Sequence, residues 1–194
     1  MSTRLACRCG LVQGQVDGSH TYGRAVCYCT DCQAFARFLG RPQEILNRQG
    51  GSDIVATHPQ HVQFTQGFDH VACMSLSPRG LLRWYAACCQ TAIGNTPRDP
   101  GMAYVGLLTD CLSATDNEID TTFGRATVAI KTESAHGEVK ATPVATFFAV
   151  LKIMGNVALA RLGGSYRRNP FFVSGTAQPV KPLKVLNKAE RQAL

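Results

Sequence analysis

The sequence predicts a mainly β domain followed by one long apolar helix, and three observations support this fold class. Short runs of alternating apolar and polar residues, separated by glycine and proline turns, occupy much of residues 1–112. A stretch of about five helical turns that is apolar almost all round follows at residues 143–162. Most of the nine cysteines fall in clusters near the N-terminus, which is typical of metal binding in a reduced protein.

The strands are expected wherever an apolar, β-rich run lies between turn-forming residues. The segment "RAVCYC" is one such run, and "SPRG" between two others predicts a hairpin. The expected strands lie at residues 5–16, 24–29, 53–58, 61–67, 70–77, 81–87 and 102–108. We therefore expect little helix before residue 112.

A short helix is expected at residues 30–39, directly after the second strand. Thr30 or Asp31 is the candidate N-cap, because short polar side chains accept hydrogen bonds from the first amides of a helix. Apolar residues follow at helical spacing, and Gly40 ends the segment. For Asp31 we favour this capping role over a hydrogen bond to a metal ligand.

The stretch "VATFFAVLKIMGNVALARL" predicts one helix at residues 143–162, with Thr142 and Pro143 at its start and two glycines after its end. About 20 apolar residues suffice to span a bilayer. A span would place Lys152 and Asn156 near the bilayer centre at a high cost. We favour a helix packed on the domain or on a partner subunit, with an interfacial membrane helix next and a span last.

The formal net charge of +7 is concentrated near the C-terminus. Seven basic residues occupy the last 34 positions: Arg161, Arg167, Arg168, Lys181, Lys184, Lys188 and Arg191. We expect a solvated basic tail at residues 165–194, after a zinc-binding β domain at 1–141 and the helix segment at 142–164. A charged tail is weak support for nucleic-acid binding, which is not expected. No export signal is recognisable at the N-terminus, so the expected location is the cytoplasm.

Seven cysteines form three clusters, and an odd total in a reduced chain favours metal ligands over disulfides. The clusters are Cys7 and Cys9; Cys27, Cys29 and Cys32; and Cys88 and Cys89. Structural zinc takes four protein ligands, whereas catalytic zinc takes three and keeps one position open. Seven clustered cysteines divide naturally into four and three, which indicates two zinc ions. Cys73 and Cys111 lie alone in apolar runs and are expected in the core.

The motifs "CRCGLVQG", "CYCTDCQAF" and "LRWY" leading into "CCQTAIGNT" resemble those of the glutathione-dependent formaldehyde-activating enzyme family, also called the CENP-V/GFA domain. The resemblance covers roughly residues 5 to 110, and the first two motifs match fully. It implies a β-rich, Mss4-like tent that holds two zinc ions. It also implies carbon–sulfur lyase chemistry on a small thiol or thiol adduct, such as a glutathione conjugate.

The resemblance also implies a role for each cysteine cluster. The structural ion would be held by Cys7, Cys9 and Cys89, with Cys88 as the substitute for a missing fourth ligand. The reactive ion, with one open position, would be held by Cys27, Cys29 and Cys32, which are the expected catalytic residues. Thiolate ligands donate strongly to the ion, so thiol handling is favoured over hydrolysis.

The third motif departs from the family pattern. Ala86 stands where the family has its first cysteine, and Gln90 stands where it has glycine, whereas Cys89 and Thr91 match. Adjacent residues in an extended strand point to opposite faces. Cys88 can therefore share an ion with Cys89 only if the chain turns sharply there.

Three interpretations of the whole chain stay open. The first is a zinc enzyme of the formaldehyde-activating type, with Gln33 and Arg37 as further candidates around its pocket. The second is a non-catalytic zinc-stabilised module that binds a partner, a nucleic acid or a membrane through its helix and tail. The third is a fold in which zinc only replaces a larger core. The helix at 143–162 could serve membrane contact or oligomer formation in any of them.

Overall fold

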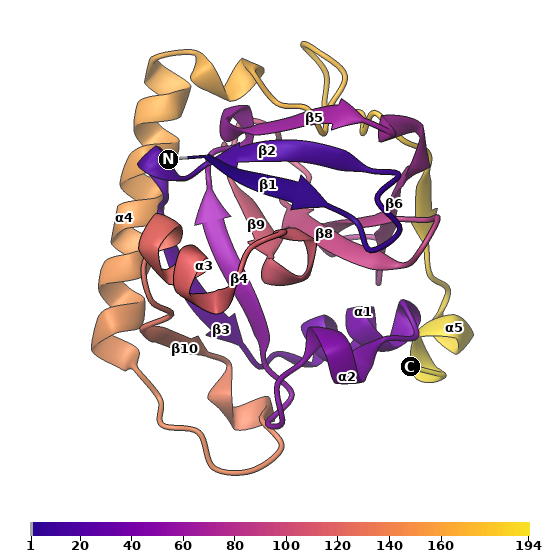
Figure 1. Ribbon diagram of the computed structural model, residues 1–194, viewed down its shortest axis with the longest axis vertical. Coiled ribbons are helices and arrows are strands. Elements are labelled where there is room, and N and C mark those ends of the chain that lie inside the picture. Colours follow the sequence, from indigo (N-terminus) through magenta and orange to yellow (C-terminus); the bar gives the residue numbers. More distant parts are fainter. Residues whose placement is uncertain (1) are drawn as a thin grey trace.

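The computed structural model describes residues 2–194, which form two β-sheets with helices around them (Figure 1). A three-stranded sheet has the order β1-β2-β5, and an eight-stranded sheet has the order β10-β3-β4-β9-β8-β7-β6-β11. The prediction of a mainly β chain with short helices and one long apolar helix is confirmed.

The small sheet consists of β1 (Ser2–Ala6), β2 (Gln13–Asp17) and β5 (Val62–Gln66). The large sheet consists of β3 (Gly23–Cys27), β4 (Ser52–Thr57), β6 (Val71–Ser75), β7 (Leu82–Ala86), β8 (Thr91–Thr96), β9 (Val105–Leu108), β10 (Val128–Ile130) and β11 (Leu183–Val185). The α-helices are α1 (Thr30–Phe38), α2 (Pro42–Ile45), α3 (Asp116–Phe123), α4 (Pro143–Leu162) and α5 (Lys188–Gln192).

The main core receives side chains from both sheets and includes Trp84 of β7. The indole ring of Trp84 is fully buried, and its centroid lies 5.0 Å from that of Phe171. The indole N–H donates to the Thr96 hydroxyl over 3.0 Å, so the one polar atom of this large side chain is satisfied. The hairpin predicted around "SPRG" is confirmed, because β6 pairs with β7 in antiparallel register.

Several elements differ from the expected pattern. The run predicted as one strand at residues 5–16 is two strands, β1 and β2, joined by the turn that carries the first cysteine pair. Strands β8, β10 and β11 were not predicted. All six residues of β8 are buried, so it lacks the alternation that marks a half-exposed strand. Strands β10 and β11 have only three residues each, and they pair with β3 and β6 from distant parts of the chain.

The expectation of a solvated tail at residues 165–194 is wrong for much of that segment. Phe171 and Phe172 are buried in the main core, and Leu186 is buried in a second core cluster. Strand β11 pairs in parallel with β6 at the edge of the large sheet. The prediction gave weight to the lysines and arginines and overlooked two short apolar runs, "PFFV" and "PLKVL". The burial of these runs offsets the entropic cost of ordering the segment.

The N-cap of α1 is Cys29, so the expected caps Thr30 and Asp31 are wrong. The Cys29 backbone is extended, and its sulfur accepts a hydrogen bond from the Cys32 amide over 3.3 Å. Asp31 lies in the first turn instead and forms an ion pair of 2.8 Å with Arg191 of α5. The cap of this helix is thus one of the clustered cysteines.

Helix α4 has the predicted bounds and runs along one side of the molecule (Figure 1). It packs only a narrow stripe of mostly small residues against the body, where Val157 and Ala160 are buried. By length and composition α4 could cross a membrane, and only 11% of its most apolar 18-residue window is buried.

Candidate metal centres

The structure brings the seven clustered cysteines together in two groups. The first, called here the tetrad, contains Cys7, Cys9, Cys88 and Cys89. The second, the triad, contains Cys27, Cys29 and Cys32. Within each group all sulfur atoms lie within 4.8 Å of one another, so each group could hold a metal ion. The division into four and three agrees with the division expected from the sequence.

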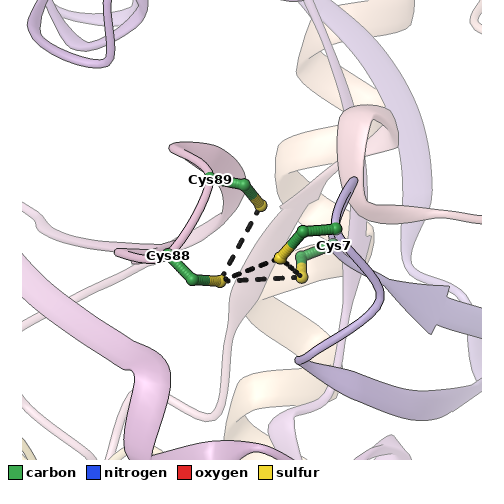
Figure 2. A group of neighbouring side chains, drawn as sticks. Cys7, Cys88 and Cys89 are labelled. Atoms are coloured by element: carbon green, nitrogen blue, oxygen red, sulfur yellow. Dashed lines mark hydrogen bonds between the residues drawn. The ribbon is translucent and has the colours of Figure 1, made fainter.

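The tetrad is built from two turns that belong to different sheets. Cys7 and Cys9 lie in the β1–β2 turn, and Cys88 and Cys89 lie in the β7–β8 turn. Figure 2 shows Cys88 and Cys89 on one turn facing Cys7 on the other. The Cys88 sulfur lies 3.9 Å from that of Cys7 and 3.3 Å from that of Cys9. A metal ion here would join the two sheets.

The β7–β8 turn has the sharp bend that a shared ion requires. The amides of Cys89 and Gln90 both donate to the Ala86 carbonyl, at 3.4 and 2.8 Å. Gln90 has a φ of +58°, the left-handed conformation that favours glycine. Both cysteine side chains therefore reach the same site, with their sulfurs 3.8 Å apart. Cys88 thus joins the group of four sulfur atoms, as the sequence analysis expected only for a sharp turn here.

Hydrogen bonds from the surrounding chain orient the tetrad sulfurs. The Val12 amide donates to the Cys7 sulfur over 3.2 Å, and the Thr91 hydroxyl lies 3.2 Å from the Cys89 sulfur. The Arg8 amide donates to the same hydroxyl over 3.1 Å. Such partners fix the direction of a ligand before any metal binds.

Two thiols of the tetrad have pKa values that are shifted in opposite directions. Burial raises the pKa of Cys89, but hydrogen bonds with Thr91 and with the other cysteines outweigh it and lower that pKa to about 6. Burial and contacts with Cys9 and Cys7 raise the pKa of Cys88. The lowered pKa favours the thiolate form of Cys89 near neutral pH, and a thiolate is the form that binds a metal ion.

A buried ion-pair network supports the β7–β8 turn from behind. The Arg41 guanidinium donates to the Gln90 carbonyl and to the Asp110 carboxylate, both over 3.2 Å. The Asp110 carboxylate also accepts from the Ala92 amide over 2.9 Å. Arg41 lies between α1 and α2, so this network connects the tetrad to the helices that follow the triad. The sequence analysis missed both charged residues, because nothing in the local pattern marks a pair 69 positions apart.

The triad lies where β3 ends and α1 begins, within six consecutive residues. Cys27 is the last residue of β3, Cys29 is the N-cap of α1, and Cys32 lies in its first turn. Cys27 and Cys32 are buried, whereas Cys29 is partly exposed. Hydrogen bonds from Cys27 and Cys32 hold the pKa of Cys29 well below its usual range, and the bond with Cys29 raises the pKa of Cys27.

Two residues near the triad were not expected from the sequence. Arg83 of β7 is buried, lies 5.2 Å from the Phe35 ring centroid and donates to Asn95 over 3.1 Å. Its positive charge contributes to lowering the pKa of Cys29. Burial, reinforced by the nearby thiols of Cys27 and Cys32, raises the pKa of Tyr104 to about 12. Arg83 lies in β7 and Tyr104 directly precedes β9, both distant from the triad in sequence, so no motif could have identified them.

An apolar cavity of about 470 Å³ adjoins the triad, between α4 and the large sheet. Ile54 and Ile130 line this cavity and also pack against the triad cysteines. Tyr104 lines the same cavity. The triad thus has an apolar cavity on one side and the partly exposed Cys29 as its accessible ligand.

The other candidate residues have structural contacts. The side-chain amide of Gln33 donates to the carbonyls of Tyr28 and Ser134 over 2.9 and 2.8 Å, and its oxygen lies 3.0 Å from His136 Nε2. Arg37 is exposed on α1, on the side of a groove that also contains His136.

The two isolated cysteines, Cys73 and Cys111, are buried in the main core as expected. Burial raises the pKa of Cys73 to about 12 and raises that of Cys111 as well. Neither belongs to the groups of sulfur atoms that could hold a metal.

The comparisons with known proteins identify a family but no activity. The family described as "Family of unknown function (DUF6151)" matches residues 1–183, which include both cysteine groups, α4 and the start of β11. No curated protein matches the chain.

Proposed function

We propose that this chain, which belongs to the DUF6151 family of unknown function, is a two-zinc protein that handles small thiols at its triad. The proposed reaction class is the reversible joining of a thiol sulfur to a carbonyl carbon, the carbon–sulfur lyase chemistry that the motif resemblance implies. The observation that carries the proposal is the combination of a four-cysteine group with a three-cysteine group in one chain. The first matches a closed structural site and the second an open one.

The sulfur donor sets fit zinc better than other common metals. Thiolates select soft or borderline ions such as zinc, whereas Mg²⁺ and Ca²⁺ prefer oxygen ligands. All nine cysteines are free thiols. Thiols in this number persist in a reducing compartment, and the cytoplasm is the location we propose.

Two features support an Mss4-like tent as the fold of the zinc-binding part. The tetrad combines the first and third cysteine pairs, which is the ligand set that the resemblance implies for the structural ion. Gln90 adopts the left-handed backbone conformation at the position where that family has glycine. The backbone conformation at Gln90 therefore supports the alignment of the third motif, although Ala86 stands where that family has a cysteine.

A zinc ion held by three protein thiolates would leave one position for an incoming thiol, which it would bind as the thiolate. Cys29 is the partly exposed ligand, so the open position is expected on its side of the triad. The buried charge of Arg83 favours additional negative charge at this site. Tyr104 keeps its proton at neutral pH and is available as a hydrogen-bond donor in the adjoining cavity.

The metal content tests the arrangement of the two sites. We expect two zinc ions per chain in the wild type and one in a Cys29→Ser variant that keeps its fold. Cys73→Ala is the matched control, because it removes a buried thiol outside both groups and should keep both ions. Absence of zinc from the wild type would refute the proposal. Loss of the whole fold in Cys29→Ser would show that the triad ion is structural.

Substrate turnover tests the chemistry. The wild type and Cys29→Ser would be incubated with a panel of thiol–aldehyde adducts, including those of glutathione, and the products followed by mass spectrometry. We expect the wild type to change the rate at which at least one adduct forms or breaks down, and Cys29→Ser to lose this effect. A zinc-loaded wild type that leaves every adduct unchanged would favour a non-catalytic zinc module.

A further inference from the structure

The outer face of α4 is apolar along its whole length and has no partner within residues 2–194. Six large apolar side chains are each more than half exposed: Val144, Phe147, Phe148, Leu151, Leu159 and Leu162. At 3.6 residues per turn they lie on one side of a helix about 30 Å long. A continuous exposed apolar face of this kind marks an interaction surface.

The inner face of α4 is different in character. Ala145, Ala149 and Ala160 lie there with a few larger residues such as Val157, and this face packs on the body of the protein. The helix therefore directs mainly small residues to its own domain, together with Ile153 and Val157, and most of its large apolar residues away from it. Burial within the chain does not account for its composition.

The charged residues of α4 and of the segment that follows it are all positive. One carboxylate from elsewhere in the chain, that of Asp99, lines a pocket together with Arg161. Lys152 and Arg161 are exposed beside the apolar face, and Arg167 and Arg168 follow the helix. Residues 139–189 contain no aspartate or glutamate. A second copy seated on α4 would bring the same positive charges together without a carboxylate on either helix to pair with them. An anionic lipid surface instead offers negative charge around an apolar interior.

Both ends of α4 are fixed to the same folded body. At its start, the Thr142 hydroxyl accepts a hydrogen bond from the Ala129 amide over 2.9 Å. After its end, the Ser165 hydroxyl lies 3.1 Å from His58 Nε2, and Phe171 is fully buried in the core. A spanning helix would place these two ends on opposite sides of a bilayer and pull β11 out of the sheet. The helix can therefore lie on a membrane without crossing it.

We propose that the outer face of α4 docks this protein onto an anionic lipid surface, with the helix parallel to the membrane. The large apolar side chains enter the headgroup boundary, and Lys152 and Arg161 contact lipid phosphates at its edges. This inference does not depend on the chemistry of the triad.

Vesicle flotation tests the apolar contribution. We expect the full-length wild type to float with vesicles of phosphatidylcholine mixed with phosphatidylserine. In the Leu151→Gln/Leu159→Gln variant, partitioning should fall by about a hundredfold, because two large apolar side chains no longer enter the lipid. The matched control is Leu11→Gln/Leu81→Gln, which changes two exposed leucines outside α4 and should float like the wild type.

The charge contribution is tested with the same vesicles. The Lys152→Gln/Arg161→Gln variant should lose roughly thirtyfold in partitioning, and wild-type binding should weaken with added salt. Equal binding of the wild type to vesicles of phosphatidylcholine alone would contradict the proposed anionic surface. A wild type that does not float would overturn the proposal. So would a dimer in analytical ultracentrifugation that dissociates in the Leu151→Gln/Leu159→Gln variant, because α4 would then be covered by a second copy.

Discussion

The tetrad and the triad use the same side chain but are assembled in different ways. The tetrad combines two turns 81 residues apart, one from each sheet. The triad lies within six consecutive residues at a strand–helix junction. Cys9 and Cys88 of the tetrad are exposed, whereas two of the three triad cysteines are buried.

Because of this difference, we expect the tetrad to contribute mainly to stability and the triad mainly to chemistry. An ion at the tetrad would close a loop of about 80 residues, so its binding free energy would contribute to folding of the whole domain. An ion at the triad would close only a short loop that the strand and helix already define. We therefore expect loss of the first site to affect mainly stability, and loss of the second to affect mainly function.

The largest expected effect comes from Cys88→Ser. The variant should bind one zinc ion less and lose on the order of 4 kcal/mol in its free energy of unfolding, a fraction of what a structural zinc supplies. Denaturant titration and metal analysis would measure both quantities. Chelation of the wild type should produce a similar loss and should add little in the variant. A variant as stable as the wild type would show that the tetrad has no structural ion.

The next largest effect is expected at the network behind the tetrad. Arg41→Met should cost roughly 3 kcal/mol, because the Asp110 carboxylate, whose side chain is 11% exposed, would lose its charged partner. The tetrad should also bind zinc more weakly, since the Gln90 carbonyl loses its donor, whereas the triad should keep its ion. Denaturant titration and zinc competition would measure these effects.

Two further variants control this prediction. Arg41→Met/Asp110→Asn should recover part of the lost stability, because no unpaired charge remains. Arg8→Met removes an arginine whose ion pair with Glu44 is exposed, and it should change stability little. Equal losses for Arg41→Met and Arg8→Met would argue against the proposed network.

Cys29→Ser is expected to change stability by only about 1 kcal/mol, because serine is itself a good N-cap and preserves the first turn of α1. Any activity on thiol adducts should be lost together with one zinc ion. Thermal denaturation and the turnover assay, run on the same preparation as Cys88→Ser, would compare the two sites directly. A greater loss of stability in Cys29→Ser than in Cys88→Ser would reverse the comparison.

The smallest effect is expected at Gln90. Gln90→Gly should stabilise the protein by roughly 0.5 kcal/mol, because glycine adopts the left-handed conformation without the steric cost, although it also has more freedom when unfolded. Gln90→Val should destabilise it and weaken zinc binding at the tetrad, because a β-branched residue resists this conformation. Lys131 is the other non-glycine residue with a positive φ among residues 2–194. The Lys131→Gly variant is therefore the control for the backbone effect alone. Denaturant titration and zinc competition would follow all three variants.

The sequence by itself determined the local features of this protein. Cysteine spacing singled out the seven clustered residues and their division into four and three, because ligands close in sequence are held close by a turn or a helix start. Hydrophobic pattern placed the hairpin of β6 and β7 and the bounds of α4, since neighbours along the chain decide both. It also showed that α4 was unusually apolar.

Only the tertiary structure decided features that depend on distant parts of the chain. Cys88 could be placed in the tetrad only once the bend at Gln90 was known. Arg83 and Tyr104 influence the triad from parts of the chain that are distant in sequence. The C-terminal segment was mistaken for a solvated tail because its few apolar residues bury themselves in a surface made by other strands. The sequence also could not show which face of α4 points away from the domain, because a helix that is apolar all round gives no sign of which face its own domain covers.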